Sequence, residues 1–168
     1  NNSDNEAFSS NLIYRKKFKK QGQTLSAQIR QDYKLQESDG FLLALNNFYE
    51  GNGNITRTDT IDQEKINRNK DNSISAKLSY THPLSKKTYL EFNYGFLNSK
   101  RLADRRTLEK ADPNSNKYDV EVPLLTNKFD YENTGHTGGI NFRYSKPKKI
   151  SFSIGGSVAK NNLLQTDL

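Results

Sequence analysis

The sequence predicts an all-β chain that folds as an antiparallel meander of about six strands. Apolar and polar residues alternate with period two over most segments, which is typical of strands with one apolar face. A unit of strand, short basic turn and strand also recurs about every 60 residues, with its turns near 20–22, 83–86 and 145–148. Helical periodicity is not sustained over any long window.

The clearest hairpin surrounds residues 81–88. Every second residue is apolar in 72–80, and the same holds in 89–96. Pro83 cannot donate a hydrogen bond to a strand ladder, so it belongs to the turn. Strands are expected at 10–19, from 23 onward, at 72–82, from 87 to about 108, at 128–144 and at 149–160.

Two polar excursions, near 35–72 and 109–127, separate the three short hairpins. Residues 35–40 are expected to form a kink or turn, and 51–54 have the composition of a turn. The first excursion has room for a hairpin that extends the neighbouring strands. Residues 1–9 are polar and are expected to lie in a preceding loop. The connections therefore alternate between short and long.

The composition indicates which kind of β protein this is. Hydrophobic residues make up 32% of the chain and the mean hydropathy is −0.95, which leaves few residues for a large globular core. The nine Tyr and nine Phe mostly occupy alternating positions, which argues against disorder. Low hydropathy with alternation is typical of a transmembrane β-barrel, as is a series of short periplasmic turns and long extracellular loops. We therefore interpret residues 1–168 as a single fragment of a larger barrel.

Specific side chains are expected to face lipid in such a barrel. They are the apolar members of the alternating segments: Leu78, Tyr80, Leu90, Phe92, Tyr94, Phe142, Tyr144, Ile150, Phe152 and Ile154. Four tyrosines near the short turns are expected to form a periplasmic aromatic girdle: Tyr14, Tyr80, Tyr89 and Tyr144. The alternative for these tyrosines is cross-strand packing in a soluble sheet.

The net charge of +7 is concentrated in the short turns, where 15–20, 81–88 and 144–149 contain no acidic residue. Such turns suit anionic headgroups, and they equally suit ordinary solvated turns. A nucleic-acid-binding sheet is a weaker hypothesis, because the basic residues lie in separate turns.

Catalytic, cofactor and metal sites are not expected. His82 and His136 have no partners at a defined spacing, and the chain has no Cys. The acidic residues of 59–64 do not match a calcium loop. The glycines of the last two strands are not followed by a helix, so they are interpreted as sites of crowding or bulges: Gly135, Gly138, Gly139, Gly155 and Gly156. The chain is not expected to be an enzyme.

Residues 12–26, 45–49 and 78–94, which include the turn Tyr80-Thr-His-Pro-Leu84, resemble the outer-membrane β-barrel family related to TonB-dependent receptors. The resemblance implies the middle of a larger barrel in the outer membrane of a Gram-negative bacterium, without counterparts of the plug domain or the TonB box. It implies a role in nutrient uptake, with lipid, further strands or other copies of the chain, and an inner-membrane energising complex as partners. The alternative is a soluble all-β binding or adhesion module.

Overall fold

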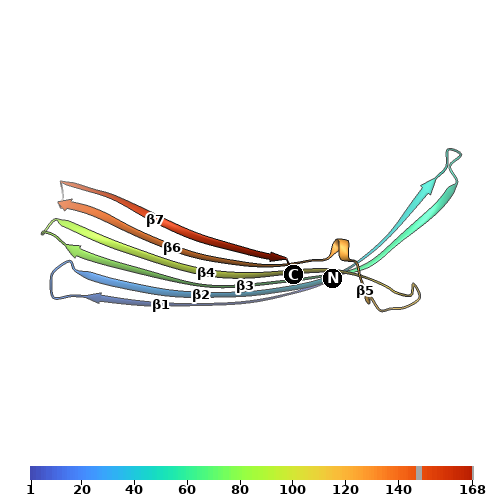
Figure 1. Cartoon of the computed structure of the whole chain (residues 1–168), viewed down its shortest axis with the longest axis horizontal. Helices are drawn as coiled ribbons and strands as arrows, with labels where there is room; N and C mark the ends of the chain where they lie inside the picture. Colours follow the sequence, from blue (N-terminus) through green and yellow to red (C-terminus); the bar gives the residue numbers. More distant parts are fainter. Residues whose placement is uncertain (147–148, 168) are drawn as a thin grey trace.

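The computed structural model describes residues 1–146 and 149–167. The chain forms one antiparallel sheet in the order β1-β2-β3-β4-β6-β7, with β5 beside β4 (Figure 1). The elements are β1 (Asn2–Lys17), β2 (Thr24–Tyr49), β3 (Ile55–Pro83), β4 (Thr88–Glu109), β5 (Val120–Glu121), the 3₁₀ turn η1 (Pro123–Leu125), β6 (Asn127–Lys146) and β7 (Ile150–Asp167). The predicted all-β meander is confirmed, with six long strands in chain order and one strand of two residues.

The short and long connections lie at opposite ends of the sheet (Figure 1). The β1–β2, β3–β4 and β6–β7 turns share what we call the short-turn end, although residues 147 and 148 of the third predicted turn lie outside the described residues. The β2–β3 hairpin tip and the loop after β4 lie at the long-loop end. Gly22 has a φ of 83°, which favours glycine, in the turn between β1 and β2.

Three segments are more regular than the sequence predicted. Residues 35–40, expected to be a kink, pair continuously with 65–70 of β3, so the excursion at 35–72 contains only a short turn at 50–54. Residues 2–9, expected to be a loop, belong to β1. β7 continues to Asp167 rather than ending near 160. Backbone pairing in a ladder does not require apolar side chains, so polar composition did not reveal these strand segments.

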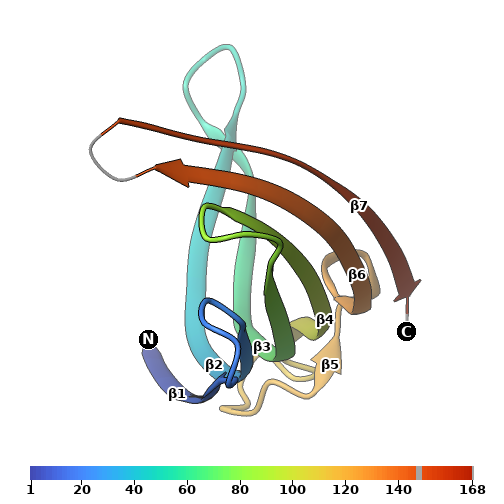
Figure 2. The same ribbon diagram turned by 90° about the vertical axis from the view of Figure 1, so that its left-hand side faces the viewer.

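The sheet is a single curved and twisted layer (Figure 2). Among the described residues no hydrophobic side chain is buried, and the buried polar ones are Gln63 and Thr107. A soluble β-sandwich needs apolar side chains enclosed between two layers. This sheet therefore lacks the core that the soluble alternative requires. Within the described ranges, no helix has the length and apolarity to cross a membrane.

Candidate membrane-facing and lumen-facing surfaces

The strand register places the ten predicted lipid-facing residues on one face of the sheet. Directly opposed residues in an antiparallel pair share a face. Leu78 lies opposite Tyr94, and Tyr80 lies opposite Phe92. The same correspondence continues from Leu90 through β6 to β7, and it includes all ten candidates. We call this the apolar face and the opposite one the polar face. Contact of the apolar face with lipid remains a prediction.

Further residues belong to the same face but were absent from the predicted set. Leu12 lies opposite Ile29 on β2, Ile140 lies opposite Phe92, and Val158 lies opposite Gly138. Val158 is 79% exposed, consistent with its position on the edge strand. The alternation around 12–29, in 138–144 and in 149–160 was the available signal for these residues. Lys16 and Gly138, which interrupt the apolar pattern, weakened it.

The apolar face ends abruptly toward the long-loop end. Past Ile74 in β3, the same face carries ion pairs between Arg68 and Glu37 (2.6 Å), and between Lys100 and Glu132 (3.1 Å). The apolar stretch on β3 thus covers about 74–82, close to the roughly 9–11 residues of a tilted transmembrane strand. The remaining length of the strands extends beyond the apolar band, where ion pairs lie on both faces of the sheet.

The four tyrosines of the predicted aromatic girdle do not all lie on the same face of the sheet. Tyr14, Tyr80 and Tyr144 lie on the apolar face near the short turns, and the Tyr144 ring centroid is 5.5 Å from that of Phe152. The assignment of Tyr89 to the girdle was wrong. Tyr89 lies opposite Arg143 on the polar face, with the guanidinium 5.1 Å from its ring centroid. Tyr89 directly precedes Leu90, so the period of two places it on the other face.

The two histidines contact polar neighbours on the apolar face. His82 Nε2 lies 3.2 Å from Lys20 Nζ, and His136 Nδ1 lies 2.8 Å from the Tyr94 hydroxyl oxygen. In the part of the chain that the structure describes, no three His, Cys, Asp or Glu side chains gather as a metal site would require.

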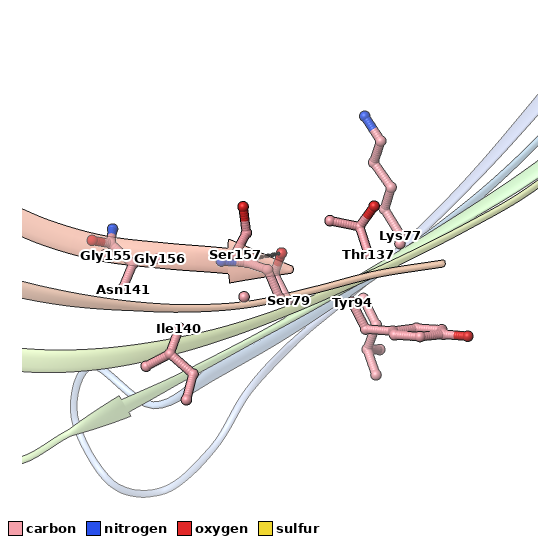
Figure 3. Close-up of a pocket in the computed structure, with 13 residues that line it drawn as sticks. Lys77, Ser79, Tyr94, Thr137, Ile140, Asn141, Gly155, Gly156 and Ser157 are labelled. Carbon is pink, nitrogen blue, oxygen red and sulfur yellow. Dashed lines mark hydrogen bonds between the residues drawn. The ribbon is translucent and has the colours of Figure 1, made fainter. Parts of the chain in front are cut away.

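The polar face contains a hollow of about 500 Å³ over the middle of β3, β4, β6 and β7. Figure 3 shows Lys77, Thr137 and Ser157 pointing to one side of the sheet, while Ile140 and Tyr94 point to the other. The floor of the hollow is formed by glycine, because Gly95, Gly139 and Gly155 all lie on this face. The predicted alternative of a bulge is wrong here, since the β6–β7 register is continuous.

Gly155 and Gly156 provide a matched pair of substitutions. A Cβ atom at Gly155 would lie 2.8 Å from the Ile140 carbonyl oxygen, whereas a Cβ at Gly156 would meet nothing within 4 Å. Because the crowding atom belongs to the backbone, Gly155→Ala should lower the free energy of unfolding by about 1–3 kcal/mol. Gly156→Ala should change it by less than about 1 kcal/mol. Urea titration of the folded protein in vesicles would measure both, and equal losses would contradict the crowding at Gly155.

A polar cluster fastens the loop after β4 to the sheet at the long-loop end. Asp62 accepts hydrogen bonds from Lys110 Nζ (2.6 Å) and from the Tyr118 hydroxyl (2.6 Å). The Tyr118 ring centroid also lies 5.4 Å from that of Phe41. The Lys110 hydrogen bond, followed by that of Tyr118, lowers the pKa of Asp62, while Asp62 raises the pKa of both partners.

This cluster should hold the loop most firmly near neutral pH. The folded pKa of Asp62 is below its unfolded value, so its contribution is complete at neutral pH and is lost as the pH falls through the folded pKa. The pKa values of Lys110 and Tyr118 are raised, so their contributions disappear as the solution becomes strongly alkaline.

If the cluster holds the loop, Tyr118→Phe should speed hydrogen exchange at the Val122 amide severalfold at pH 7, because this amide bonds to Thr107 next to the loop. Tyr49→Phe, at the exposed hairpin tip, is the control. An unchanged exchange rate in Tyr118→Phe would show that the cluster does not hold the loop against the sheet.

Comparison with known proteins agrees with this geometry. The profile of the outer membrane protein beta-barrel family matches residues 16–158, from the end of β1 to the middle of β7. A search of curated proteins finds no match. The match covers most of the chain, including the strands that carry the apolar band. The chain therefore belongs to the outer membrane protein beta-barrel family and has its place in the bacterial outer membrane.

Proposed function

We propose that this chain is part of a non-enzymatic barrel of the TonB-dependent receptor type, which carries a nutrient across the outer membrane. The observation that supports it best is the two-sided sheet. Apolar residues from Leu90 to Phe96 alternate with polar ones, so an apolar outer wall is backed by a hydrophilic lining. A closed barrel of such strands would enclose a water-compatible passage. The turn formed by residues 80–84 resembles those of TonB-dependent receptors, for which an inner-membrane complex supplies the energy.

The open edges indicate further partners for the sheet. β1 pairs with β2 alone and β7 pairs with β6 alone among the described elements. Backbone groups in hydrocarbon must be paired, so a transmembrane sheet cannot keep such edges. The partners of these edges are additional strands of the same barrel or other copies of the chain, and lipid covers the apolar face.

Nutrient uptake can be tested even when the solute is not identified in advance. Cells with and without the protein would be grown in one defined medium, and depletion of each component would be followed by mass spectrometry. The same measurement would be made in cells that lack the energising complex. We expect one class of solute to be depleted more slowly in both mutants. Depletion that needs the protein but not the complex would indicate a passive channel, and an unchanged profile would refute uptake.

One observation favours adhesion or binding as a second candidate. Beyond Asp39, β2 no longer pairs with β1, and β3 no longer pairs with β4 past Gln63. The remaining hairpin projects from the sheet (Figure 1) and exposes large apolar side chains, including Leu43 (69%) and Leu45 (64%). Exposed apolar patches commonly mark interaction sites. If the uptake profile is unchanged, loss of cell attachment on deleting residues 41–62 would support this role.

A further inference from the structure

We infer that the polar face attracts small anionic solutes, so that the passage it lines favours carboxylate- or phosphate-bearing molecules over cations. This inference rests on the proposed role of the polar face as the lining of a barrel. It is carried by how the charges of the chain divide between the two faces of the sheet.

The polar face of the six long strands is strongly cationic. It carries ten basic residues: Arg15, Lys17, Arg30, Lys34, Arg57, Lys65, Lys77, Arg101, Arg105 and Arg143. It carries six acidic ones: Asp32, Asp59, Asp71, Glu91, Glu109 and Asp167. The net charge of this face is therefore +4.

The other face of the same strands has nearly balanced charges. Its basic residues number eight: Lys16, Arg68, Lys70, Lys100, Arg106, Lys128, Lys146 and Lys160. Its acidic residues number nine: Asp4, Glu6, Glu37, Asp39, Asp62, Glu64, Asp104, Asp130 and Glu132. The positive charge of the sheet thus lies on the face away from the apolar band.

The acidic residues of the polar face neutralise only some of its cations. Asp32 pairs with Arg30 at 2.7 Å, and Asp71 forms an ion pair with Arg101. Within the described residues, Lys34 and Lys77 take part in no ion pair, and both are exposed. Arg105 donates to the neutral Asn67 side chain at 3.2 Å instead.

The imbalance is largest behind the apolar band, at the level of the membrane. There the polar face presents Arg15, Lys17, Lys77 and Arg143 against a single carboxylate, that of Glu91, while Arg30 is paired with Asp32. Low-dielectric walls focus the field of such charges, and pores lined by Arg and Lys select anions.

The surroundings of Lys77 suit an oxyanion. Thr137 and Ser157 line the same hollow as Lys77 and supply hydroxyl donors, whereas the Ser79 hydroxyl donates to Asn93. A cation placed there would meet Lys77 and no carboxylate among the residues that line the hollow. The solute class expected at this site is a small, multiply charged anion.

The test is equilibrium binding to the whole barrel in lipid nanodiscs, with citrate as the anionic probe. Sucrose and spermidine serve as neutral and cationic probes. We expect citrate to bind most tightly, and its affinity to fall severalfold between about 50 and about 200 mM salt, because the attraction is electrostatic. The Lys34→Gln/Lys77→Gln variant should bind citrate at least about threefold more weakly, a change of about 0.65 kcal/mol.

The matched control removes the same charge from the other face. Lys70 adjoins Asp71 in β3 but lies on the apolar face, as does Lys160 of β7. The Lys70→Gln/Lys160→Gln variant should keep the affinity of the unaltered protein, and urea titration would verify that both variants fold. Equal losses in the two variants, or citrate binding no tighter than sucrose, would overturn the inference. The binding experiment and the uptake experiment can fail separately. Uptake that does not depend on the energising complex would refute the proposed function, whereas the binding of citrate to the polar face would still test the present inference.

Discussion

Replacing Leu78 by lysine should destabilise the folded protein in a bilayer by about 2–4 kcal/mol, the cost of a cation on the lipid face near the bilayer midplane. Leu78 lies in the middle of the apolar stretch of β3, flanked by Ala27 and Tyr94 on the same face. Its side chain is exposed in the sheet, so no protein group would compensate the new charge. Urea titration in vesicles would give the free energy of unfolding.

The neighbouring position provides the control. Ser79 lies on the polar face and its hydroxyl donates to Asn93 at 2.6 Å. Ser79→Lys loses this hydrogen bond but keeps its charge in the hydrophilic lining, so it should cost only about 1 kcal/mol. If the two lysine variants are equally stable, the apolar face does not contact lipid.

The isolated chain of 168 residues should not persist as a folded monomer in detergent-free buffer. Both edge strands have free backbone groups, and the apolar face has no covering layer among the described residues. Open edges and a large apolar patch each promote association. Size-exclusion chromatography with light scattering should show oligomers or aggregates. A monodisperse folded monomer would refute the membrane assignment and restore the soluble module as the best description.

The sequence predicted the hairpins best where one face of the sheet is apolar. In 72–80 and 89–96 the alternation determines both the strands and their faces, because a slip of one residue would reverse every side chain. The alternation disappears in 35–40 and 2–9, where both faces are polar. The composition of these two segments is typical of loops, and only their pairing with the neighbouring strands shows that they are strands.

The sequence predicted which residues share the apolar face, but it did not predict the positive charge of the polar face. The ten lipid-facing candidates come from the alternating segments, and the register places them together. Tyr89 was assigned to the girdle from its proximity to a turn, and proximity does not determine the face. The cationic polar face was not predicted, because its charges come from strands distant in sequence. Arg15, Lys77 and Arg143 share a face only once the register is known.

The most direct measurement of the central claim is a spin-label scan through residues 90–97 of β4, with the protein in lipid vesicles. Accessibility to oxygen, which partitions into lipid, would be compared with accessibility to a water-soluble nickel complex. We expect a period of two, with labels at Leu90, Phe92, Tyr94 and Phe96 exposed to oxygen and labels at Glu91, Asn93 and Gly95 exposed to nickel. Equal oxygen accessibility at Phe92 and Asn93 would contradict a lipid-facing apolar band.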